Sequence, residues 1–540
     1  MSTRSFSREA SLAALRDDTF DVVVVGGGIT GAGVALDAAA RGLRTALLER
    51  HDWASGTSSK SSKLVHGGLR YLQQREYRLV AENLAERQRL LVNAPHLVTP
   101  LPFLVPLFGR NGVVNQAVAK GYSTALWMYD LAGGMRIGHR HRRIDNAEVA
   151  RHMPGLRTDR LAAGFLYYDA WADDARLTLT VARTAVDHGA VAANHLAVEA
   201  IVRGDGGRVS GVRLADGSEV AARVVVNAGG VWADHVQELA SPGATHAIRP
   251  AKGVHITLPA AKLSCDIAAV LPVPGDRRSV FVVPWGDHVY VGTTDTDYDG
   301  PLDDPRCTAQ DVEYLLGAVN AAVTEPVSES DVTGTWAGLR PLVAAASTER
   351  TADLSRRHAV TSSPDGVVSV TGGKLTTYRK MAADTVDEAV RLLGRGPRRS
   401  PTRRLRLHGA AATSSAGMPA GVDHQTWSHL KSRHGDEAAA VAALALSDPQ
   451  LAEPLVAGLP YLAAEAVWAV REEMATTLED VLARRTRALL LDREATAAAA
   501  PNVARLIGRE LAWDEDQTDA QISSFLSMVE AERDAAGARP

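Results

Sequence analysis

The feature that most constrains the fold is a glycine-rich turn that joins a buried strand to a helix near the start of the chain. Residues 21–25 (DVVVV) form a short β-branched run, residues 43–49 (LRTALLE) form a second run, and a GGGITG turn follows the first. This order is typical of domains that bind a dinucleotide, because the glycines let the backbone approach a pyrophosphate closely and the helix N-terminus attracts the same anion. The sequence therefore predicts a Rossmann-like α/β domain that depends on Gly26, Gly28 and Gly31.

One acidic residue follows this turn at the place that such a domain requires. Glu49 ends the second predicted strand. An acid at this position accepts hydrogen bonds from the ribose of a bound dinucleotide. Strand, turn, helix and acid together are far more specific than a lone G-x-G-x-x-G match. We therefore expect Glu49 to line the cofactor site.

Composition narrows the class of protein further. The 540 residues carry 59 basic and 63 acidic side chains, so the net charge of −4 excludes a disordered polyelectrolyte and disfavours a nucleic-acid-binding protein. Two cysteines cannot build a disulfide framework, and no Cys/His cluster has metal-ligand spacing, so no metal site is expected. The N-terminus has no apolar signal region, and no apolar run reaches about 18 residues. A cytoplasmic protein without a transmembrane helix is expected.

The chain divides into segments of different character. Helices are predicted over residues 7–16 and, with Asp174 as the N-cap, over residues 175–188. Strand, glycine turn and helix recur at residues 366–393, which suggests that the dinucleotide domain is discontinuous. We predict an α/β domain at residues 18–95, 165–240 and 346–393, an α+β substrate domain at 96–164 and 241–345, an Arg/Gly/Pro/Ser/Ala-rich linker at 394–422, and an all-helical domain at 423–540.

Three side chains in later segments suit the chemistry of a small anionic alcohol. His255 follows a glycine in KGVHI, and a neutral imidazole with a pKa of about 6.5 can take a proton from a hydroxyl group. Arg340, in GLRPL, either holds an oxyanion or phosphate or forms an interdomain salt bridge. Lys374 follows Gly372 and Gly373 at the start of a second helix, and its compact charge suits a phosphate or an alkoxide.

The segment at residues 57–72 (TSSKSSKLVHGGLRYL) is dense in hydroxyl and backbone donors. Beside a dinucleotide fold, such a loop is predicted to surround a phosphate and a flavin ring. Arg70 and Tyr71, at its end, are predicted to face the substrate. His66 is either a covalent attachment point for the flavin or, as is commoner, a hydrogen-bonding or packing residue.

These segments, in this order, resemble the FAD-dependent, quinone-linked glycerol-3-phosphate dehydrogenases of the D-amino-acid-oxidase-like superfamily. The resemblance rests on VGGGITGAGVALDAAARG, SSKLVHGGLRYL and GGKLTTYRKMA. WADDARL, VNAGGVWAD, KGVHI, PWGDHVYVGTTD and GLRPL are also similar to that family, as is EEMATTLEDVLARRTR in the helical domain. It covers residues 20–390 closely and residues 400–510 more loosely.

The resemblance implies oxidation of sn-glycerol 3-phosphate to dihydroxyacetone phosphate, with hydride passing from C2 to N5 of non-covalently bound FAD and electrons going on to a membrane quinone. His255 is the first candidate for the base, and an alkoxide stabilised by Arg340 or Lys374 is the competing explanation. The substrate would be bound by Arg70, Tyr71, His255, Arg340 and Lys374. The FAD would be held by Gly26, Gly28, Gly31, Glu49, Thr57, Ser58, Ser61, Ser62, Lys63, Leu64, His66, Ala228, Gly229, Gly372, Gly373, Lys374, Leu375, Thr376 and Thr377.

Other functions stay open at this point. A glycerol-3-phosphate oxidase would share the fold and use oxygen as the acceptor. An amino-acid or amine oxidase of the same superfamily is disfavoured, because the cluster of Arg70, Lys252, Arg340 and Lys374 suits a phosphate dianion better than an amine. A nucleic-acid-binding flavoprotein is disfavoured by the net charge and by the lack of aromatic residues between the arginines.

Two segments are candidates for contact with an anionic membrane. Seven arginines lie within residues 391–406, and basic residues near an anionic leaflet contribute about 1 kcal/mol each. Residues 101–132 are a rival, because their Leu, Phe and Trp side chains suit a membrane interface, although a buried cap over the substrate domain is the simpler interpretation. A homo-oligomer is compatible with the sequence.

Overall fold

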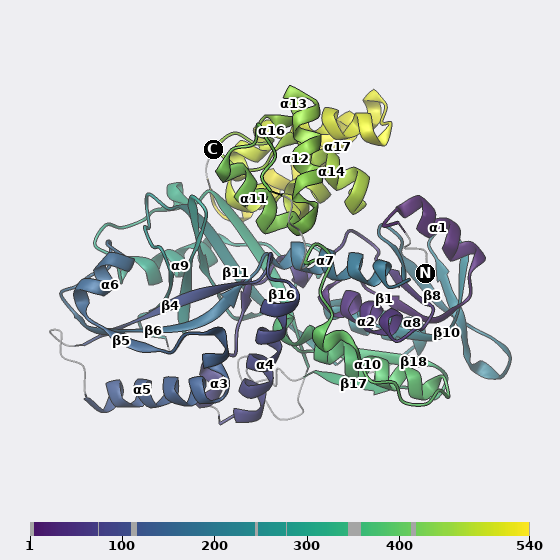
Figure 1. Cartoon of the computed structure of the whole chain (residues 1–540), viewed down its shortest axis with the longest axis horizontal. Helices are drawn as coiled ribbons and strands as arrows, with labels where there is room; N and C mark the ends of the chain where they lie inside the picture. Colours follow the sequence, from purple (N-terminus) through teal and green to yellow (C-terminus); the bar gives the residue numbers. More distant parts are fainter. Residues whose placement is uncertain are drawn as a thin grey trace.

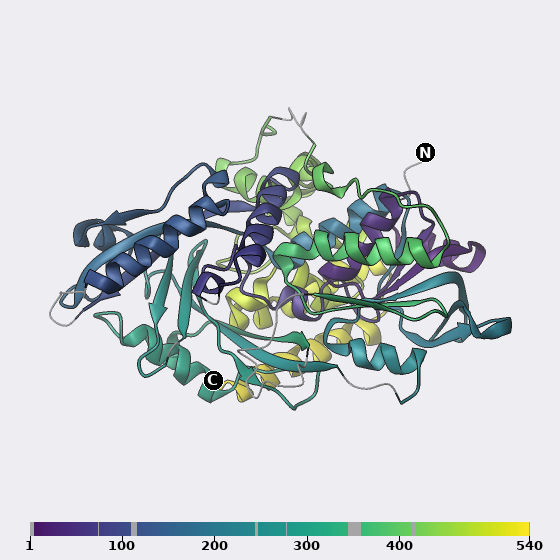
Figure 2. The ribbon, with the colours of Figure 1, turned by 90° about the horizontal axis from the view of Figure 1, so that it is seen from below.

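A computed structural model describes residues 5–73, 75–109, 116–243, 247–276, 278–343, 358–411 and 417–538. Two sheets with their helices stand side by side, and a helical domain covers one face of both (Figure 1). Figure 2, seen from below, shows helices of the two sheet domains on the opposite face. The predicted combination of an α/β domain, an α+β domain and a C-terminal helical domain is confirmed.

The first sheet collects strands from distant parts of the chain. Its central strands β1 (Phe20–Val25), β2 (Thr45–Leu48) and β10 (Glu219–Asn227) run parallel, and β10 also runs parallel to β18 (Val367–Thr371). The sheet is completed by β7 (Val191–Ala193), β8 (Val198–Arg203), β9 (Val209–Leu214) and β17 (Ala359–Ser362). The carboxyl ends of the parallel strands therefore meet at one edge, where ligands bind in such sheets.

Helices pack on both faces of the first sheet. All six residues of β1 are therefore buried. Val22 and Val24 belong to the core beneath three helices that pack in a row: α2 (Ile29–Ala40), α7 (Asp174–Asp187) and α10 (Tyr378–Leu392). Val23 and Val25 face a second core, which includes Leu15 of α1 (Arg8–Asp17). Successive valines of β1 thus pack alternately into the cores on the two faces of the sheet.

The second sheet has ten strands. Its long strands are β4 (Thr99–Phe108), β6 (Leu161–Trp171), β11 (Ile248–Pro259) and β16 (Gly334–Val343). The shorter strands of this sheet are β3 (Leu64–Val65), β5 (Arg142–Ile144), β12 (Ala268–Pro272), β13 (Ser279–Trp285), β14 (His288–Gly292) and β15 (Thr296–Asp297). The helices of this part of the chain are α3 (Arg70–Gln73), α4 (Tyr77–Asn93), α5 (Gln116–Leu131), α6 (Asn146–His152) and α9 (Ala309–Asn320). Helix α8 (Ala233–Ala240) lies beside the first sheet.

The helical domain packs Ala- and Leu-rich faces into a core of its own. It contains α11 (His424–His434), α12 (Ala438–Ser447), α13 (Pro449–Ala452), α14 (Ala463–Glu473), α15 (Ala488–Leu491), α16 (Arg493–Leu511) and α17 (Glu515–Ala535). A turn of π-helix, Asp480–Arg485, connects α14 to α15 and carries two buried arginines toward the first sheet.

Two details differ from the sequence-based expectations. Asp173, not Asp174, caps α7, and Asp174 is the first residue of the helix. The segment predicted as a linker does not run free, because Arg395 pairs with Asp21 at 2.6 Å and Arg398 donates to the carbonyl of Arg41 at 2.8 Å. Domain boundaries stay predictions: the one at 165 lies inside β6, and residues 346–357 and 412–416 lie outside the described part of the chain.

Within the described ranges, no helix is both long and apolar enough to cross a membrane.

Candidate active site

A cavity of about 270 Å³ lies at the carboxyl ends of β1, β2, β10 and β18. The glycine turn forms one wall, and two of its glycines are required by close approach. Gly26 has φ +112°, and a Cβ there would lie 2.6 Å from the carbonyl oxygen of Ala228. A Cβ on Gly31 would lie 1.8 Å from the carbonyl oxygen of Gly26. Only glycine therefore fits at these two positions, as the tight turn and the close packing of the dinucleotide motif require.

Glu49 lines this cavity and is held by its backbone neighbours. Its Oε2 accepts from the N–H of Gly27 at 2.6 Å, and its Oε1 accepts from the N–H of His51 at 2.8 Å. Burial raises the pKa of the carboxyl group, while these two hydrogen bonds act to lower it. The carboxylate is thus pre-oriented at the place where the sequence predicts contact with a ribose.

The loop that follows β2 closes the same cavity from the other side. Ser58 Oγ accepts from the N–H of Ile29 at 2.9 Å, so this serine caps the first turn of α2. Thr57 Oγ1 donates to the carbonyl of Leu339 at 2.6 Å and ties the loop to β16 of the second sheet. The loop therefore joins both sheets at the cavity.

A second cavity of about 200 Å³ continues from the first between the two sheets. Thr57, Ser58 and residues 372–375 line both cavities. The second cavity adds Arg340 and His255 from the second sheet. An elongated ligand in the first cavity would therefore end beside these side chains.

His255 is buried in β11, with 2% of its surface exposed. Its ring stacks on Trp336 at 4.7 Å and 10°, and its Nε2 lies 2.9 Å from Ser62 Oγ. Burial, with the charges of Lys63 and Arg340, holds the pKa of His255 well below 6.5. The imidazole is therefore neutral at pH 7 and has a site for a proton. Its Nδ1 has no hydrogen-bond partner among the described residues.

Arg340 lies on β16, and oxygen atoms of several neighbouring residues hold its guanidinium. Nη1 pairs with Asp295 Oδ1 at 2.9 Å, and Nη2 donates to Thr293 Oγ1 at 3.0 Å and to the carbonyl of Thr294 at 3.1 Å. The salt bridge of Arg340 is not the interdomain one predicted as an alternative, because Asp295 belongs to the same domain; Arg340 also lines the cavity. The guanidinium is therefore fixed in orientation at the wall of the cavity.

Lys374 precedes the first turn of the helix that leads into α10. Its ammonium lies 3.8 Å from the ring centroid of Tyr71, and the lysine lines both cavities. A cation held over an aromatic ring is fixed in place while it keeps its charge. The side chain of Arg70 lies outside the described part of the structure.

Most predicted site residues are brought together. Eighteen of the predicted residues line one or both cavities: Gly26, Gly28, Glu49, Thr57, Ser58, Ser61, Ser62, Leu64, His66, Ala228, Gly229, His255, Arg340, Gly372, Gly373, Lys374, Leu375 and Thr376.

Four predicted residues do not line the cavities. Gly31 packs α2 against the turn, Tyr71 lies under Lys374, and Thr377 Oγ1 donates to the carbonyl of Lys374 at 3.3 Å. Lys63 needs a correction: its ammonium lies 4.4 Å from the ring of Trp336 and 3.3 Å from Asp174, away from the cavity. The backbone of Lys63 has φ +56°, which turns the side chain into the protein interior. Burial lowers the pKa of Lys63 to about 8.

Sequence reasoning missed the residues that hold the site in place. Trp336 stacks on His255, and Asp295 anchors Arg340. Neither has a spacing signal, because each meets its partner across strands that are distant in sequence. The only hint in the sequence is that Trp336 lies in TWAGLRPL and Asp295 in GTTD, which overlap two segments that resemble the family.

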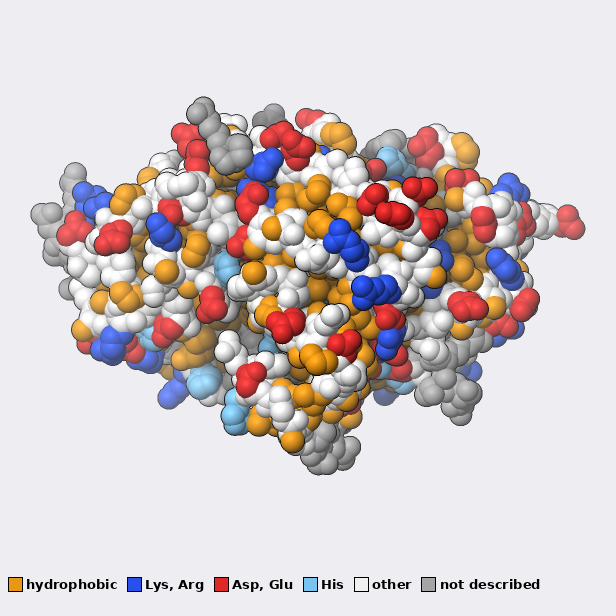
Figure 3. All heavy atoms as spheres, turned by 90° about the horizontal axis from the view of Figure 1, so that it is seen from above, with side chains coloured by type: hydrophobic (Ala, Val, Ile, Leu, Met, Phe, Trp, Pro, Cys, Tyr) orange, Lys and Arg blue, Asp and Glu red, His pale blue; other side chains and the backbone are white. Residues whose placement is uncertain are grey.

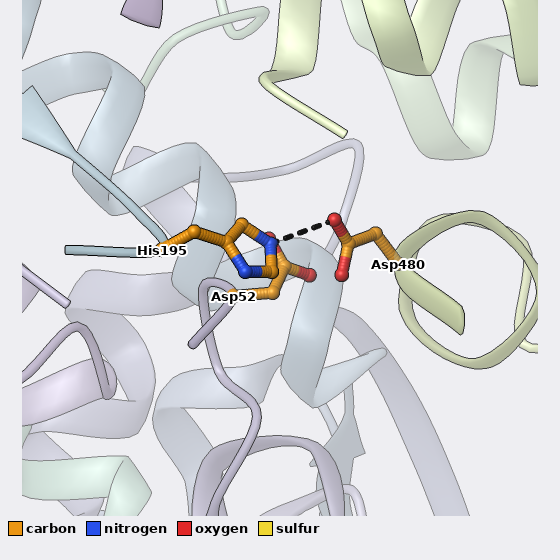
Figure 4. A group of neighbouring side chains, drawn as sticks. All are labelled: Asp52, His195 and Asp480. Atoms are coloured by element: carbon orange, nitrogen blue, oxygen red, sulfur yellow. Dashed lines mark hydrogen bonds and ion pairs between the residues drawn. The ribbon is translucent and has the colours of Figure 1, made fainter. Parts of the chain in front are cut away.

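One cluster has the composition of a metal site. Asp52, His195 and Asp480 have ligand atoms within 4.8 Å of one another (Figure 4). Arg485 binds both oxygens of Asp52 at 2.6 and 2.8 Å, and Arg484 pairs with both carboxylates at 2.6 Å. Guanidinium groups therefore neutralise these acids, and the cluster is an ion-pair junction between the first sheet and the helical domain.

The first cavity fits FAD. Gly26 approaches Ala228 too closely for any side chain, α2 directs its N-terminus to the turn, and Glu49 stands at the far end. A second helix start, at residues 372–377, faces the continuation into the second cavity. The lining thus combines glycine turns, one acid and two helix N-termini, which suits an adenosine, a pyrophosphate and a flavin ring.

Comparison with known proteins gives the same result. Residues 21–379 match the family of FAD-dependent oxidoreductases, and residues 400–518 match the C-terminal domain of alpha-glycerophosphate oxidase. Glycerol-3-phosphate dehydrogenase 2 of Mycobacterium tuberculosis is 42% identical over 97% of this chain and 90% of its own length. The mitochondrial glycerol-3-phosphate dehydrogenase of Mus musculus is 37% identical over 94% of this chain and 73% of its own.

A solved structure agrees in fold. The glycerol-3-phosphate dehydrogenase of Bacillus halodurans, solved in complex with FAD, superposes with a TM-score of 0.79 and 31% identity, covering 98% of this chain and 97% of that one. The cofactor of this chain is FAD. On its cavities, its fold and these comparisons, the chain belongs to the FAD-dependent oxidoreductases and, among them, to the glycerol-3-phosphate dehydrogenases.

Proposed function

We propose that the protein oxidises sn-glycerol 3-phosphate to dihydroxyacetone phosphate and passes the electrons to a membrane quinone. The observation that carries the proposal is the cavity of about 200 Å³, which His255, Arg340 and Lys374 line and which adjoins the first cavity. FAD, when bound, supplies the hydride acceptor. The names of the relatives support the same substrate.

Two cations are proposed to bind the substrate phosphate. Arg340 presents a planar guanidinium whose orientation is set by Asp295, and Lys374 presents an ammonium whose position is set by Tyr71. A charge-assisted hydrogen bond to phosphate contributes about 1.5–3 kcal/mol. Together they favour a phosphate dianion over the uncharged end of glycerol.

His255 is proposed to take the proton of the C2 hydroxyl. The neutral imidazole is held flat against Trp336, so it meets the substrate in one orientation. A phosphate dianion close by raises the pKa of this histidine, because a negative charge favours the imidazolium form. Substrate binding would therefore strengthen the base when it is needed.

The test is the anaerobic addition of sn-glycerol 3-phosphate to the purified flavoprotein, with glycerol as the control. Prompt loss of the oxidised-flavin absorbance with the phosphate ester, and none with glycerol, is the expected result. An FAD-loaded protein that stays oxidised with both would contradict the proposed substrate. Bleaching by an amino acid instead would favour the amine-oxidase alternative.

The electron acceptor needs its own measurement. The match of residues 400–518 to an alpha-glycerophosphate oxidase domain makes oxygen the specific competitor of a quinone. We expect the substrate-reduced protein to be reoxidised faster by a soluble quinone than by dissolved oxygen. Reoxidation by oxygen at least as fast, with stoichiometric hydrogen peroxide, would assign an oxidase.

We also propose peripheral contact with an anionic membrane through the end of α5 and the turn after it. Trp127, Leu131 and Met135 are 46, 72 and 39% exposed, and Arg136 and Arg140 are exposed beside them. Apolar side chains with neighbouring cations suit an anionic lipid interface. On the opposite face, acidic and basic side chains are intermixed (Figure 3).

Vesicles of mixed anionic and zwitterionic lipid distinguish this surface from the arginines of residues 391–406. The double variant Trp127→Ser, Leu131→Ser should lose most sedimentation with anionic vesicles, and a variant with Arg398, Arg399, Arg403 and Arg404 changed to Gln should retain it. The reverse outcome would assign the contact to the arginine segment.

A further inference from the structure

We propose that Arg487, from the helical domain, is a positioning residue for the active site. It fixes the loop of residues 59–63, which carries the Ser62 hydroxyl to His255. The inference rests on the proposed function, because it concerns the group proposed as the base. It gives the helical domain a part in the chemistry of a cavity that the two sheet domains line.

Arg487 ties three parts of the chain together. It is 1% exposed and lies between the π-helical turn and α15, with φ +66°. Its Nη2 donates to the carbonyl of Ser59 and, at 3.1 Å, to Asp174 Oδ1 of α7. Its Nη1 donates to the carbonyl of Ala483 in its own domain at 3.1 Å. One rigid guanidinium therefore joins the helical domain to the loop and to α7.

Asp174 passes this constraint on to the loop. The carboxylate is fully buried, and its Oδ2 accepts from the N–H of Ser61 at 2.9 Å and from the hydroxyl of Ser61 at 2.7 Å. Arg487 and Lys63 are the cations beside it. Loss of Arg487 would leave Lys63 to neutralise the buried carboxylate, and the change in the charges around Asp174 would disturb its bonds to Ser61.

The next residue of the loop contacts the proposed base. The Ser62 hydroxyl lies 2.9 Å from His255 Nε2, and the carbonyl of Ser62 accepts from Tyr290 OH at 2.8 Å. The carbonyl of Ser61 accepts from Trp336 Nε1 at 3.1 Å, and Trp336 stacks on His255. The contacts from Arg487 to His255 are therefore continuous, and each is a hydrogen bond, an ion pair or a ring stack.

A second connection reaches the strand that carries His255. Thr257, two residues further along β11, donates from Oγ1 to the carbonyl of Leu490 at 2.6 Å, and Thr333 donates to the carbonyl of Leu491 at 2.6 Å. Residues i and i+2 of a strand share one face. The segment from Arg487 to Leu491 thus forms hydrogen bonds with both the loop and the strand that meet at the Ser62–His255 contact.

A double-mutant cycle tests the inference on the FAD-loaded full chain. Arg487→Met should slow flavin reduction by saturating sn-glycerol 3-phosphate by about 10- to 100-fold, because a small misplacement of reacting groups has effects of that size. If Arg487 acts through Ser62, Arg487→Met combined with Ser62→Ala should be no more than about twofold slower than Ser62→Ala alone. Multiplying effects would overturn the inference.

A measurement without substrate separates this inference from the proposed function. Hydrogen exchange, followed by mass spectrometry, should show faster exchange of the peptide that spans residues 59–63 in Arg487→Met than in the unmodified protein. Asp174→Asn, which keeps the side-chain volume, should do the same. Unchanged exchange in both variants would overturn the inference, even for a protein that oxidises glycerol 3-phosphate. If only the unmodified protein's reaction with substrate fails, the proposed function alone is wrong.

Arg183→Gln is the matched control. Arg183 of α7 also pairs with the helical domain, through two bonds of 2.6 and 2.8 Å to Glu437, but it does not contact the loop. We expect normal flavin reduction and normal exchange at residues 59–63 in this variant. Equal effects from Arg183→Gln and Arg487→Met would show that Arg487 only holds the domains together.

Discussion

The two halves of the active-site channel are built in different ways. The half proposed to hold FAD, the cofactor half, is built around glycine turns: Gly26, Gly229 and Gly373 line it with Glu49, beside apolar side chains such as Trp232. The substrate half depends on charged or titratable side chains, and each of them is fixed by a residue from elsewhere in the chain, as Asp295 fixes Arg340. The turn at Gly26 and the acid Glu49 come from one short segment of sequence, whereas Arg340 and His255 are oriented by partners on other strands and loops. The two halves should therefore respond differently to mutation.

The largest effect is expected at His255. His255→Asn should slow flavin reduction by about 10²- to 10⁴-fold, the usual contribution of a general base, without loss of bound FAD. Stopped-flow absorbance measures the rate, and the flavin-to-protein absorbance ratio measures the cofactor. A rate within threefold of the unmodified protein would favour the alternative in which Arg340 or Lys374 stabilises an alkoxide.

Gly26→Ala should affect the cofactor half alone. The positive φ and the 2.6 Å approach to Ala228 make any side chain strained, so FAD should bind about 10- to 100-fold more weakly, while the rate at saturating FAD changes little. Titration of the apoprotein with FAD measures the affinity. Gly189→Ala is the control, since Gly189 has φ +94° but nothing within 4 Å of an added Cβ. Equal FAD affinity in both variants would refute the close-approach argument.

Arg340→Met should affect the substrate half alone. Loss of a charged hydrogen bond to phosphate, about 1.5–3 kcal/mol, predicts a rise in KM of about 10- to 100-fold with FAD content unchanged. Arg249→Met is a matched control, because Arg249 pairs with Asp297 at 2.7 Å near the surface of the same domain. A variant Arg340→Met that keeps its KM for glycerol 3-phosphate would remove Arg340 from the phosphate site.

The smallest effect is expected at another ion-pair cluster between the first domain and the C-terminal part of the chain, the one that contains His408. His408 lies 2.8 Å from Asp187 and 3.0 Å from Glu437; burial lowers its pKa, but these carboxylates outweigh burial and raise it to about 9. A raised pKa stabilises the fold fully below the unfolded value of about 6.5, and this contribution is lost as the pH rises through 9.

Thermal unfolding from pH 6 to pH 9.5 tests whether the stabilisation by His408 decreases as the pH rises. His408→Gln should be less stable than the unmodified protein by about 1–3 kcal/mol at pH 6, and the difference should fade toward pH 9.5. A difference that grows with pH would contradict the assignment of His408 as a charged junction residue.

Local motifs placed most of the proposed FAD residues at the first cavity. The strand, turn and acid that contain Gly26 and Glu49 are contiguous in sequence, and hydrogen bonds between near neighbours set their geometry. Lys63 shows where such reasoning fails. It lies in a loop whose neighbours do line the cavity, but its own backbone conformation and the buried Asp174 turn it inward.

The sequence by itself determined the α/β turn, the choice of FAD-binding fold and the candidates His255, Arg340 and Lys374, because short-range spacing encodes them. Only the tertiary structure decided which partners orient those side chains: Trp336, Asp295, Tyr71 and, through Ser61 and Ser62, Arg487 of the helical domain. The physical reason is that orientation in a buried site comes from contacts between segments that are far apart in the sequence, and the periodicity of a single segment carries no record of such contacts.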